Sequence, residues 1–398
     1  MQPPALLLGG LNMVRALGLG RVPVIVASPR ADAPAARSRF ALQSIRLPPL
    51  EDRATLVGTL LRAGERLSAA AGCRLPLFYS NDDYLSLVHE NRDALGRHFA
   101  LMLNPPEVAQ ALIDKERFEG FARSRGLRVP RRLDWDELGR WPAPVLVKPK
   151  LKIGYDDSPT RIELFERGKA RVFANGPQLA AHPLARRLRE QLLLQEYVPG
   201  DDHQLWSFHG YADEKGELLA WFVGRKLRTF PLLTGQSAYL ELVHDPAFAW
   251  VGRQVAARVP LRGAFKIDFK QDSTNGVWHV FEINARFTLW HYLAARNGLN
   301  LPRIAYDYLT TGKRPRLWDY ATTYRWFSLR HDYRAYRALA ARGELGFWGW
   351  LRSIAQAPRV YDVLSWSDPL PFVRHVLSRA RRFPNLTVRF KQWLSTAS

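Results

Sequence analysis

One strand with polar residues at alternate positions constrains the fold of this chain more than any other stretch. Residues 277–287 read VWHVFEINARF, in which Glu282, Asn284 and Arg286 occupy every second position. Successive strand side chains point to opposite faces, so these three share one face, and Phe281 begins an apolar face expected in the core. An acid, an amide and a guanidinium in a row indicate a functional surface on this strand.

The preceding segment, GAFKIDFK, is expected to be the partner strand across the turn QDSTNG. An antiparallel hairpin centred on Asn275 places Asp268 opposite Glu282 and Lys266 opposite Asn284, so all four share one face. A strict two-residue Asn-Gly turn would shift this register by one residue. We therefore predict a loop of odd length, three or five residues.

The oxygen-bearing residues of this predicted face suit a metal ion. Asp268, Glu282 and Asn284 would supply carboxylate and amide oxygens from two adjacent strands. Magnesium prefers hard oxygen ligands, usually one or two carboxylates together with substrate phosphates. The alternative is an ordinary surface ladder of charged residues.

Basic residues occur where apolar segments end, as a polyphosphate site would require. Lys148 closes the apolar run APVLVKP, Lys115 follows a Pro-rich break, and Lys226 and Arg228 follow a further apolar strand. Lysines directed at one place suit a polyphosphate. Taken singly, a lysine at a strand end is more often a solvated terminus than a ligand-binding residue.

The order of these motifs resembles the ATP-grasp superfamily over residues 104–300. The segment FVGRKLRTFPLLTGQSAYLELVHDP, residues 222–246, is similar to the carboxylate–amine ligase group related to D-aspartate ligase. The motifs in chain order are Asp114-Lys115, Lys148-Pro149, Gln195-Glu196, Lys226, Lys266-x-Asp268 and Glu282-x-Asn284-x-Arg286.

The resemblance implies a nucleotide site between two subdomains. Lys115 and Lys148 would hold the α- and β-phosphates of ATP. Glu196 and Val198 would meet the adenine through backbone groups, and Asp202 would hold the ribose hydroxyls.

The same resemblance implies the catalytic residues and the metal site. Lys226 would touch the transferring γ-phosphoryl group, and Arg286 would stabilise the acyl-phosphate and its tetrahedral successor. Asp268, Glu282 and Asn284 would bind one or two Mg²⁺ ions.

Two departures from the family pattern are visible. Lys266, the third expected catalytic residue, stands where many relatives have an Arg, and a lysine is a point charge where Arg is a bidentate fork. The segment KLKIGYDDSPTR, residues 150–161, has Gly154 as its one glycine where relatives cover the phosphates with a Gly-rich loop, and Asp156 and Asp157 are unexplained beside an anion.

The expected fold class is α/β and α+β. An apolar run, Gly9-Gly10, a helical stretch and a second apolar run indicate a βαβ unit, but the glycine spacing does not match G-x-G-x-x-G, and no P-loop is present. One continuous helix is expected between the Pro-rich break at 104–106 and Gly126. The expected domains are a Rossmann-like pre-ATP-grasp domain (1–103), two ATP-grasp subdomains (104–195 and 196–312) and a basic, aromatic-rich, mostly helical extension (313–398).

The implied reaction joins a small-molecule carboxylate to an amine, with ATP as the phosphoryl donor and Mg²⁺ as cofactor; an amino acid or a cell-envelope precursor is one substrate class. Two rivals within the superfamily are a carboxylase or phosphotransferase and a member that binds ATP without catalysis. A rival from another class is a basic protein that binds nucleic acid or another polyanion through its net charge of +21, from 58 Lys+Arg against 37 Asp+Glu. The sequence contains no nucleic-acid motif, so no nucleic-acid partner is expected.

The ends of the chain bear on its location. The N-terminal apolar run lacks a basic segment before it, and no uncharged apolar stretch approaches the roughly 20 residues needed to cross a bilayer, so a cytoplasmic protein is expected. After Asp368 the chain has no acidic residue, and an amphipathic basic helix from about Pro371 is expected to contact anionic lipid at the inner face of the membrane or else to pack with its Arg residues in solvent. The single cysteine, Cys73, is expected to be buried.

Overall fold

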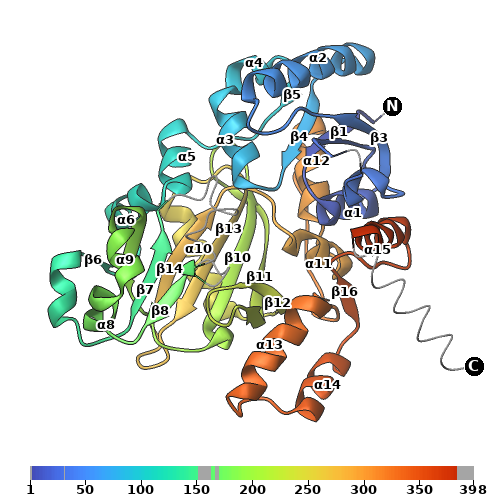
Figure 1. The fold of residues 1–398 in the computed structure, drawn as a ribbon. Coiled ribbons are helices and arrows are strands. Elements are labelled where there is room, and N and C mark those ends of the chain that lie inside the picture. The colour runs from blue at the N-terminus through green and yellow to red at the C-terminus, as the bar shows by residue number, and fades with distance from the viewer. Residues whose placement is uncertain (1, 31, 151–162, 166–169, 383–398) are drawn as a thin grey trace, which may run out of the picture.

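The computed structural model describes residues 2–30, 32–150, 163–165 and 170–382, and these form three sheets with helices around them (Figure 1). The sheets have five, seven and four strands. The segment 150–161, in which a Gly-poor phosphate loop was predicted, lies outside the described residues apart from Lys150, as does the tail after Arg382.

The N-terminal part is the predicted open α/β domain. Its five strands are all parallel, in the order β3-β2-β1-β4-β5, and every residue of β1 and β4 is buried. Parallel strands covered on both faces need such continuous apolar runs. Cys73, expected to be buried, is exposed just after a helix end. The elements are β1 (Ala5–Leu8), α1 (Leu11–Leu19), β2 (Val24–Ser28), β3 (Ala41–Arg46), α2 (Arg53–Ala71), β4 (Leu75–Tyr79), α3 (Asp82–Glu90), α4 (Arg92–Gly96) and β5 (Phe99–Ala100).

The next part is an antiparallel sheet of order β6-β9-β7-β8, preceded by two helices. The prediction of one continuous helix here is wrong. Asp114 ends the first helix in an extended conformation and caps the second by accepting hydrogen bonds from the Glu116 and Arg117 backbone N–H groups, so Lys115 begins a new helix. The elements are α5 (Pro106–Ile113), α6 (Lys115–Ser124), β6 (Arg132–Leu133), β7 (Val145–Pro149), β8 (Arg171–Phe173), α8 (Gly176–Ala181), α9 (Pro183–Arg187) and β9 (Leu192–Glu196).

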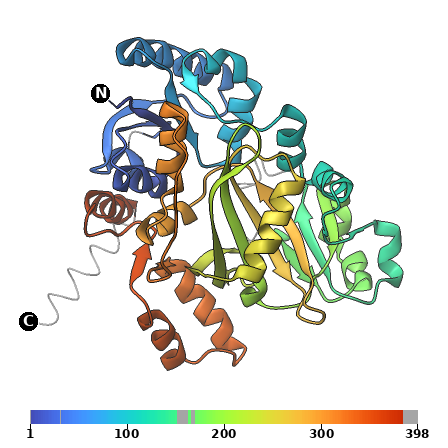
Figure 2. The same ribbon diagram turned by 180° about the vertical axis from the view of Figure 1, so that it is seen from behind.

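The largest sheet has the order β14-β13-β10-β11-β12-β15-β16. One of its faces is core: Phe269 packs edge-on against Phe248 of α10, with ring centroids 5.1 Å apart, and Figure 2 shows this helix lying across the sheet. The elements up to the expected extension are β10 (Leu205–Ala212), β11 (Leu218–Phe230), β12 (Gln236–Leu242), α10 (Pro246–Arg258), β13 (Gly263–Gln271), β14 (Trp278–Asn284), α11 (Trp290–Arg296) and α12 (Leu301–Thr311).

The predicted hairpin register is confirmed, but not by the predicted loop. Asp268 pairs with Glu282 and Lys266 with Asn284. The loop between β13 and β14 spans six residues, 272–277, so the prediction of an odd loop is wrong. A β-bulge restores the predicted register despite the even loop. Phe269 pairs with Val280 and Asp268 with Glu282, so Phe281 is an extra, unpaired residue on β14.

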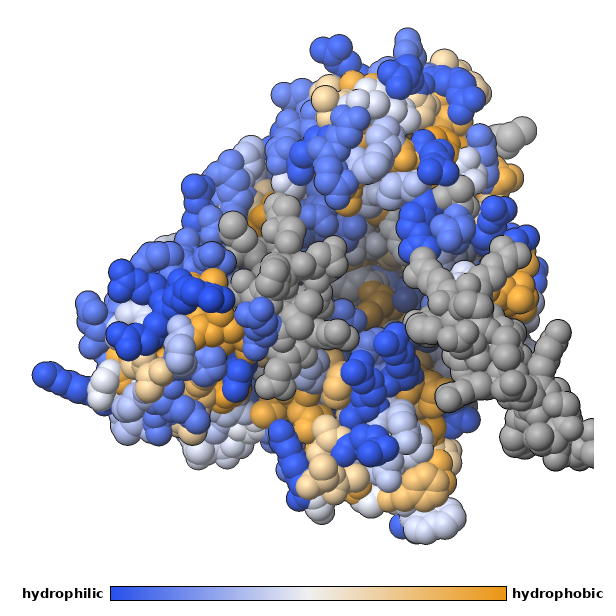
Figure 3. Space-filling model, viewed as in Figure 1, coloured by the Kyte–Doolittle hydropathy of each residue, from blue (hydrophilic) through white to orange (hydrophobic). Residues whose placement is uncertain are grey.

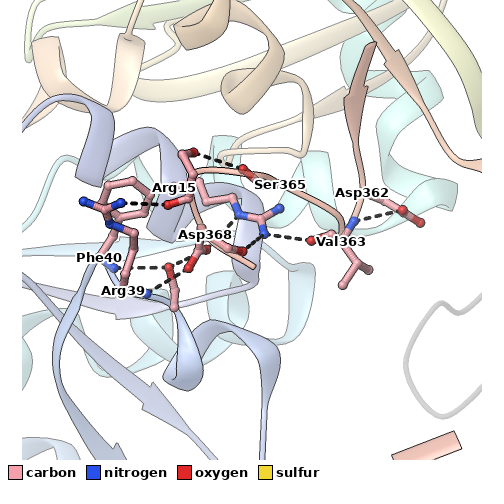
Figure 4. A network of polar contacts seen from close by, with 9 residues as sticks. Arg15, Arg39, Phe40, Asp362, Val363, Ser365 and Asp368 are labelled. Carbon is pink, nitrogen blue, oxygen red and sulfur yellow. Dashed lines mark hydrogen bonds and ion pairs between the residues drawn. The ribbon is translucent and has the colours of Figure 1, made fainter. Parts of the chain in front are cut away.

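The expected C-terminal extension also contributes strands to the large sheet. β15 pairs with β12, and β16 pairs with β15, so the sheet continues past the predicted boundary at residue 312. The segment before α15 returns to the N-terminal domain, where Asp368 meets Arg15, Ser38 and Arg39 (Figure 4). The elements are β15 (Arg325–Phe327), α13 (Leu329–Ala341), α14 (Phe347–Ala355), β16 (Arg359–Tyr361) and α15 (Leu370–Arg382).

The hydrophobic cores do not follow the predicted domain boundaries. One core joins Leu6 of the N-terminal domain to Ile267 and Ile283 of the hairpin, and a second joins Val14 to Leu293. The third core is confined to the four-stranded unit, from Leu133 to Leu194. Within the described ranges, none of the helices combines the length and apolar character that a membrane span requires.

Candidate active site

The polar face of the hairpin forms a compact hydrogen-bonded group. Lys266 Nζ lies 2.7 Å from Asp268 Oδ1, which also accepts a hydrogen bond from Ser207 Oγ at 2.9 Å. Asn284 Nδ2 donates to Asp268 Oδ2 at 3.3 Å. Ser207 comes from β10, where it pairs directly with Asp268. Three strands therefore converge on one carboxylate.

Burial makes Lys266 an unusual cation. Its side chain is 12% exposed, and desolvation lowers its pKa to about 8. The charge of Lys226 lowers the pKa further, while Asp268 and Glu282 oppose the shift. This charge effect requires Lys226 of β11 to lie near Lys266. Its neighbour Arg228 does not join them, because its guanidinium is buried against Asp332 of α13.

Arg286 is held from two sides at the end of β14. Its Nη2 donates to Asn284 Oδ1 at 3.1 Å, and its Nε and Nη2 donate to the two carboxylate oxygens of Asp82 at 2.8 and 2.9 Å. Burial alone would lower the pKa of Arg286, but the hydrogen bonds and charge of Asp82 raise it above its ordinary value, with Glu282 and Asp268 adding to the effect. Arg286 therefore remains a cation at any relevant pH.

The bulge changes the predicted place of Phe281. The residue was expected on the core face, yet it is half-buried and lies outside the core that holds Val280 and Ile283. Its ring instead lies 5.2 Å from Lys148 Nζ. Because a bulge turns two successive residues toward the same side, Phe281 is brought to the side of the sheet that carries the candidate site.

Lys115 and Lys148 meet at the end of β7. Lys115 Nζ donates to the carbonyl oxygen of Pro149 at 2.9 Å, so α6 is tied to the strand end that carries Lys148. The contact of Lys148 with Phe281 links this strand end to the hairpin. The structure thus brings both predicted phosphate-binding lysines to the edge of the hairpin face.

The strand β9 leads into the predicted adenine contacts. The Glu196 backbone N–H donates to Arg131 O at 2.9 Å, and the Arg131 N–H donates to Glu196 Oε1 at 2.8 Å. The side chain thereby replaces the Glu196 carbonyl oxygen as acceptor in this ladder. Val198, two residues on, is buried with 4% of its surface exposed.

Asp202, predicted to hold the ribose hydroxyls, is hydrogen-bonded to the protein through its carboxylate. Its carboxylate is buried and accepts hydrogen bonds from Thr229 N at 2.6 Å, Thr229 Oγ1 at 2.8 Å and Leu233 N at 3.0 Å. These contacts connect Asp202 to the end of β11 and to the chain just after it. A carboxylate has about four lone-pair sites, so the predicted ribose hydroxyls would share this carboxylate with the protein donors.

Three residues near the site were not predicted. Asp82 and Ser207 bond to the hairpin residues, and Lys270 continues the polar face of β13 two residues beyond Asp268. Lys270 Nζ lies 4.2 Å from the centre of the Tyr197 ring, and burial lowers its pKa to about 8. The alternation Lys266, Asp268, Lys270 was visible in the sequence and is the signal that would have found Lys270.

The donor set fits a magnesium ion better than a softer metal. Among the described residues, no group of three or more His, Cys, Asp or Glu is arranged to hold a metal. Asp268, Glu282 and Asn284 provide two carboxylates and an amide, the small oxygen set that Mg²⁺ completes with phosphate oxygens and water. Asn284 directs its NH₂ group at Asp268 and its oxygen at Arg286, so coordination through that oxygen beside Asp268 requires the amide to turn over.

The surface above the large sheet is hollowed. Figure 3 shows a recess near the middle of this face of the molecule, where Figure 1 places the seven-stranded sheet between the four-stranded unit and the C-terminal helices. Residues 151–162, which include the unexplained Asp156 and Asp157, lie outside the described part of the chain.

Comparison with known proteins identifies the fold. No family model matches the sequence. The chain is 20% identical over 272 residues to D-aspartate ligase of Enterococcus faecium (strain Aus0004), a match that covers 65% of this chain and 64% of that protein. The chain therefore spans slightly less than two thirds of the length of this curated relative.

Solved structures of two enzymes superpose on most of the chain. A biotin carboxylase from Campylobacter jejuni, in its β,γ-ATP complex, has a TM-score of 0.58 at 14% identity and covers 82% of this chain and 74% of its own. An L-amino acid ligase from Bacillus licheniformis has a TM-score of 0.56 at 13% identity and covers 78% and 75%. The predicted resemblance is confirmed: the chain has the ATP-grasp fold, and its sequence is similar to that of a D-aspartate ligase.

Proposed function

We propose that this chain is an ATP-dependent ligase that joins a carboxylate to an amine through an acyl-phosphate. The observation that carries the proposal is the hairpin face on which Lys266, Asp268, Glu282, Asn284 and Arg286 gather at the confirmed register. Cations, metal-type oxygen donors and an always-charged guanidinium on one face match the demands of phosphoryl transfer, which needs positioning and charge stabilisation more than covalent chemistry.

The reaction follows from these parts. A carboxylate oxygen of the substrate attacks the γ-phosphorus of ATP, the bond to the bridging oxygen breaks, and ADP leaves. An amine then attacks the acyl carbon, the carbon–oxygen bond to phosphate breaks, and the nitrogen loses a proton. Lys226 and Lys266 would offset charge on the transferring group, and Arg286 would hold the acyl-phosphate.

The nucleotide would be held along the rest of the face. Lys115 and Lys148 would bind the α- and β-phosphates, and the Glu196 carbonyl oxygen and Val198 would meet the adenine. Asp268, Glu282 and Asn284 would hold one or two Mg²⁺ ions, which when bound neutralise phosphate charge and polarise the transferring group.

The substrates are small molecules carrying a carboxylate and an amine. The similarity to a D-aspartate ligase makes D-aspartate and other amino acids the first carboxylates to test. A screen of ADP release against paired carboxylates and amines identifies the pair. Trapping with hydroxylamine then tests the mechanism, since an acyl-phosphate yields a hydroxamate, whereas phosphoryl transfer to another acceptor yields none.

Arg286→Ala gives the sharpest test of the assigned site. Turnover is expected to fall by about 100-fold or more while ATP affinity changes little, because the guanidinium acts on the acyl-phosphate and its successor. Arg66→Ala, at an exposed position of α2, is the matched control. Wild-type turnover in Arg286→Ala would refute the assignment.

A carboxylase is the second candidate, favoured by the similarity to biotin carboxylase. Bicarbonate-dependent ADP release without any other carboxylate would identify it.

We also propose that α15 contacts anionic lipid. Its outward side carries Leu370, Val373, Val376 and Leu377, each between 46% and 51% exposed, and Trp366 just before the helix is 88% exposed. Arg374 is exposed on the same helix, and apolar and cationic groups together suit the surface of an anionic bilayer. Flotation with anionic vesicles should be lost when the chain is truncated after Asp368, and equal flotation of both proteins would exclude this contact.

A further inference from the structure

The pairing of Arg286 with Asp82 joins the candidate site to the N-terminal domain. The two residues are 204 positions apart, and two parallel hydrogen bonds at 2.8 and 2.9 Å connect the guanidinium edge to both carboxylate oxygens. Such a side-on, bidentate pair fixes the plane of the guanidinium as well as its position. The side chains are 17% and 23% exposed, so solvent screens the pair only partly.

The contacts leave one end of Arg286 for a ligand. Nε and one N–H of Nη2 bond to Asp82, and Nη2 also donates to Asn284 Oδ1 at 3.1 Å. Among the contacts of the described residues, Nη1 is the nitrogen of this side chain that bonds to neither of these partners. Asp82 thereby determines which edge of the guanidinium meets a phosphoryl or acyl-phosphate group.

Asp82 is itself held by rigid structure. It is the first residue of α3, whose N-cap Asn81 accepts a hydrogen bond from Tyr84 N at 2.8 Å. The helix follows β4. In the sheet, β4 lies beside β1, and β2 lies on the other side of β1. The residues after β1 and β4 thus lie at the point where the strand order reverses, the usual ligand-facing edge of an open parallel sheet.

We propose that Asp82 is a positioning residue for Arg286, through which the N-terminal domain becomes a working part of the phosphoryl-transfer site. The inference rests on the proposed function, because it assigns Arg286 to the transferring group. Asp82 acts on the reaction through Arg286 and is not a catalytic residue. A purely structural salt bridge between domains is the competing explanation, and it predicts that nucleotide binding and stability change together.

The test measures binding of MgADP by calorimetry, with and without aluminium fluoride as a mimic of the transferring phosphoryl group. In the wild-type chain, aluminium fluoride should lower the Kd for MgADP, and Arg286→Ala should abolish this tightening. Asp82→Asn should leave the Kd for MgADP alone within about twofold and reduce the fluoride-dependent tightening about tenfold to a hundredfold, the cost of a misplaced group. Asp82→Glu, which keeps the charge, should recover part of it.

Two further variants separate positioning from stability. Asp93→Asn removes an acid from the first turn of the neighbouring helix α4, is exposed, and should match the wild type in both measurements. Asp82→Asn/Arg286→Ala should lose no more tightening than Arg286→Ala alone, because a positioning residue has no effect once its target is gone.

Each other result overturns the inference. If Asp82→Asn shows the same tightening as the wild type, Asp82 does not act on Arg286. If Asp82→Asn loses affinity for MgADP equally with and without aluminium fluoride, Asp82 is structural. If the wild type shows no tightening, Arg286 does not contact the transferring group, and Asp82 has no contact to orient. Failure of the wild type to bind MgADP refutes the proposed function itself. If Asp82→Asn does not fold, Asp82→Glu must still show the selective loss in milder form.

Discussion

Replacing Asp368 by Ala is the change whose effect on stability follows most directly from the structure. The carboxylate accepts hydrogen bonds from Arg15 Nε at 3.0 Å, Ser38 Oγ at 2.8 Å and Arg39 N at 2.9 Å (Figure 4). The Arg15 and Asp368 side chains are 0% and 1% exposed. The substitution therefore leaves a buried guanidinium without its counter-charge and two further donors without their acceptor.

The expected loss is about 3 kcal/mol in the free energy of unfolding. Removing one partner of a buried ion pair typically costs about 3–5 kcal/mol, because the remaining charge stays buried and uncompensated. Arg15 retains two acceptors, Val363 O at 2.7 Å and the backbone oxygen of residue 368 at 3.1 Å, which places the estimate at the lower end. An exposed pair is worth less than about 1 kcal/mol.

Urea unfolding measures the difference. Glu190→Ala breaks the exposed pair of Arg189 and Glu190, whose side chains are 64% and 82% exposed, and is the matched control. The double variant Arg15→Met/Asp368→Ala should be more stable than Asp368→Ala, because the unpaired charge is removed as well. A loss in Asp368→Ala no larger than that of the control would refute the view that this network secures the C-terminal segment.

Three further outcomes are expected from calorimetric binding of ADP and MgADP. In metal-free ADP binding, phosphate charge should raise the pKa of Lys266 from about 8, so binding should take up protons at pH 9 and almost none below pH 7. Buffers of different ionisation enthalpy measure the uptake, and Lys266→Met should lose it. Asp268→Asn should weaken MgADP binding at least about tenfold without weakening metal-free ADP, since it removes a metal ligand and relieves repulsion of phosphate. Unchanged MgADP affinity would place the metal elsewhere. Deleting Phe281 should leave a folded chain that still binds MgADP, because the bulge residue is extra to the register, but more weakly than the wild type, because Lys148 loses its contact with the ring. Deleting Ile283 should abolish binding by reversing the faces of the residues after it.

The register of the site was predictable, while the means of achieving it was not. Alternation along two strands fixes which residues must share a face, and that sufficed to pair Asp268 with Glu282. An odd loop and an even loop with one bulged residue satisfy the same parity, and no residue type in the hairpin distinguishes them. The structure uses the second solution, which turns Phe281 from the expected core face toward Lys148.

Contacts that depend on packing between domains were beyond the sequence. The acids after β4 were visible as Ser80-Asn81-Asp82-Asp83 directly behind a buried strand, but nothing in that run names Arg286 as the partner. Arg228 shows the reverse case. It lies two residues from Lys226 in the sequence, yet it forms an ion pair with Asp332 of α13. Residue spacing alone does not predict the position of that helix.

Asp202 shows what a family motif leaves out at one position. The resemblance assigned its carboxylate to a ribose, but that carboxylate accepts hydrogen bonds from Thr229 and Leu233, so it organises the chain beyond β11. Lys270, which the resemblance did not single out, occupies the polar face of β13 near the same turn. The polar alternation of the strand indicates Lys270, because it is set by local geometry.

The distribution of the cores explains why two halves of the site depend on different interactions. Residues of the N-terminal domain and of the hairpin share a core, so the geometry that joins Asp82 to Arg286 is supported by the same packing that stabilises both elements. Lys148 belongs to the four-stranded unit, whose core is its own. Its position relative to Phe281 therefore depends on contacts across a boundary, such as the 5.2 Å approach of Lys148 to that ring. Changes at this boundary should alter phosphate binding while leaving the orientation of Arg286 unchanged, because shared packing resists displacement more than a surface contact does.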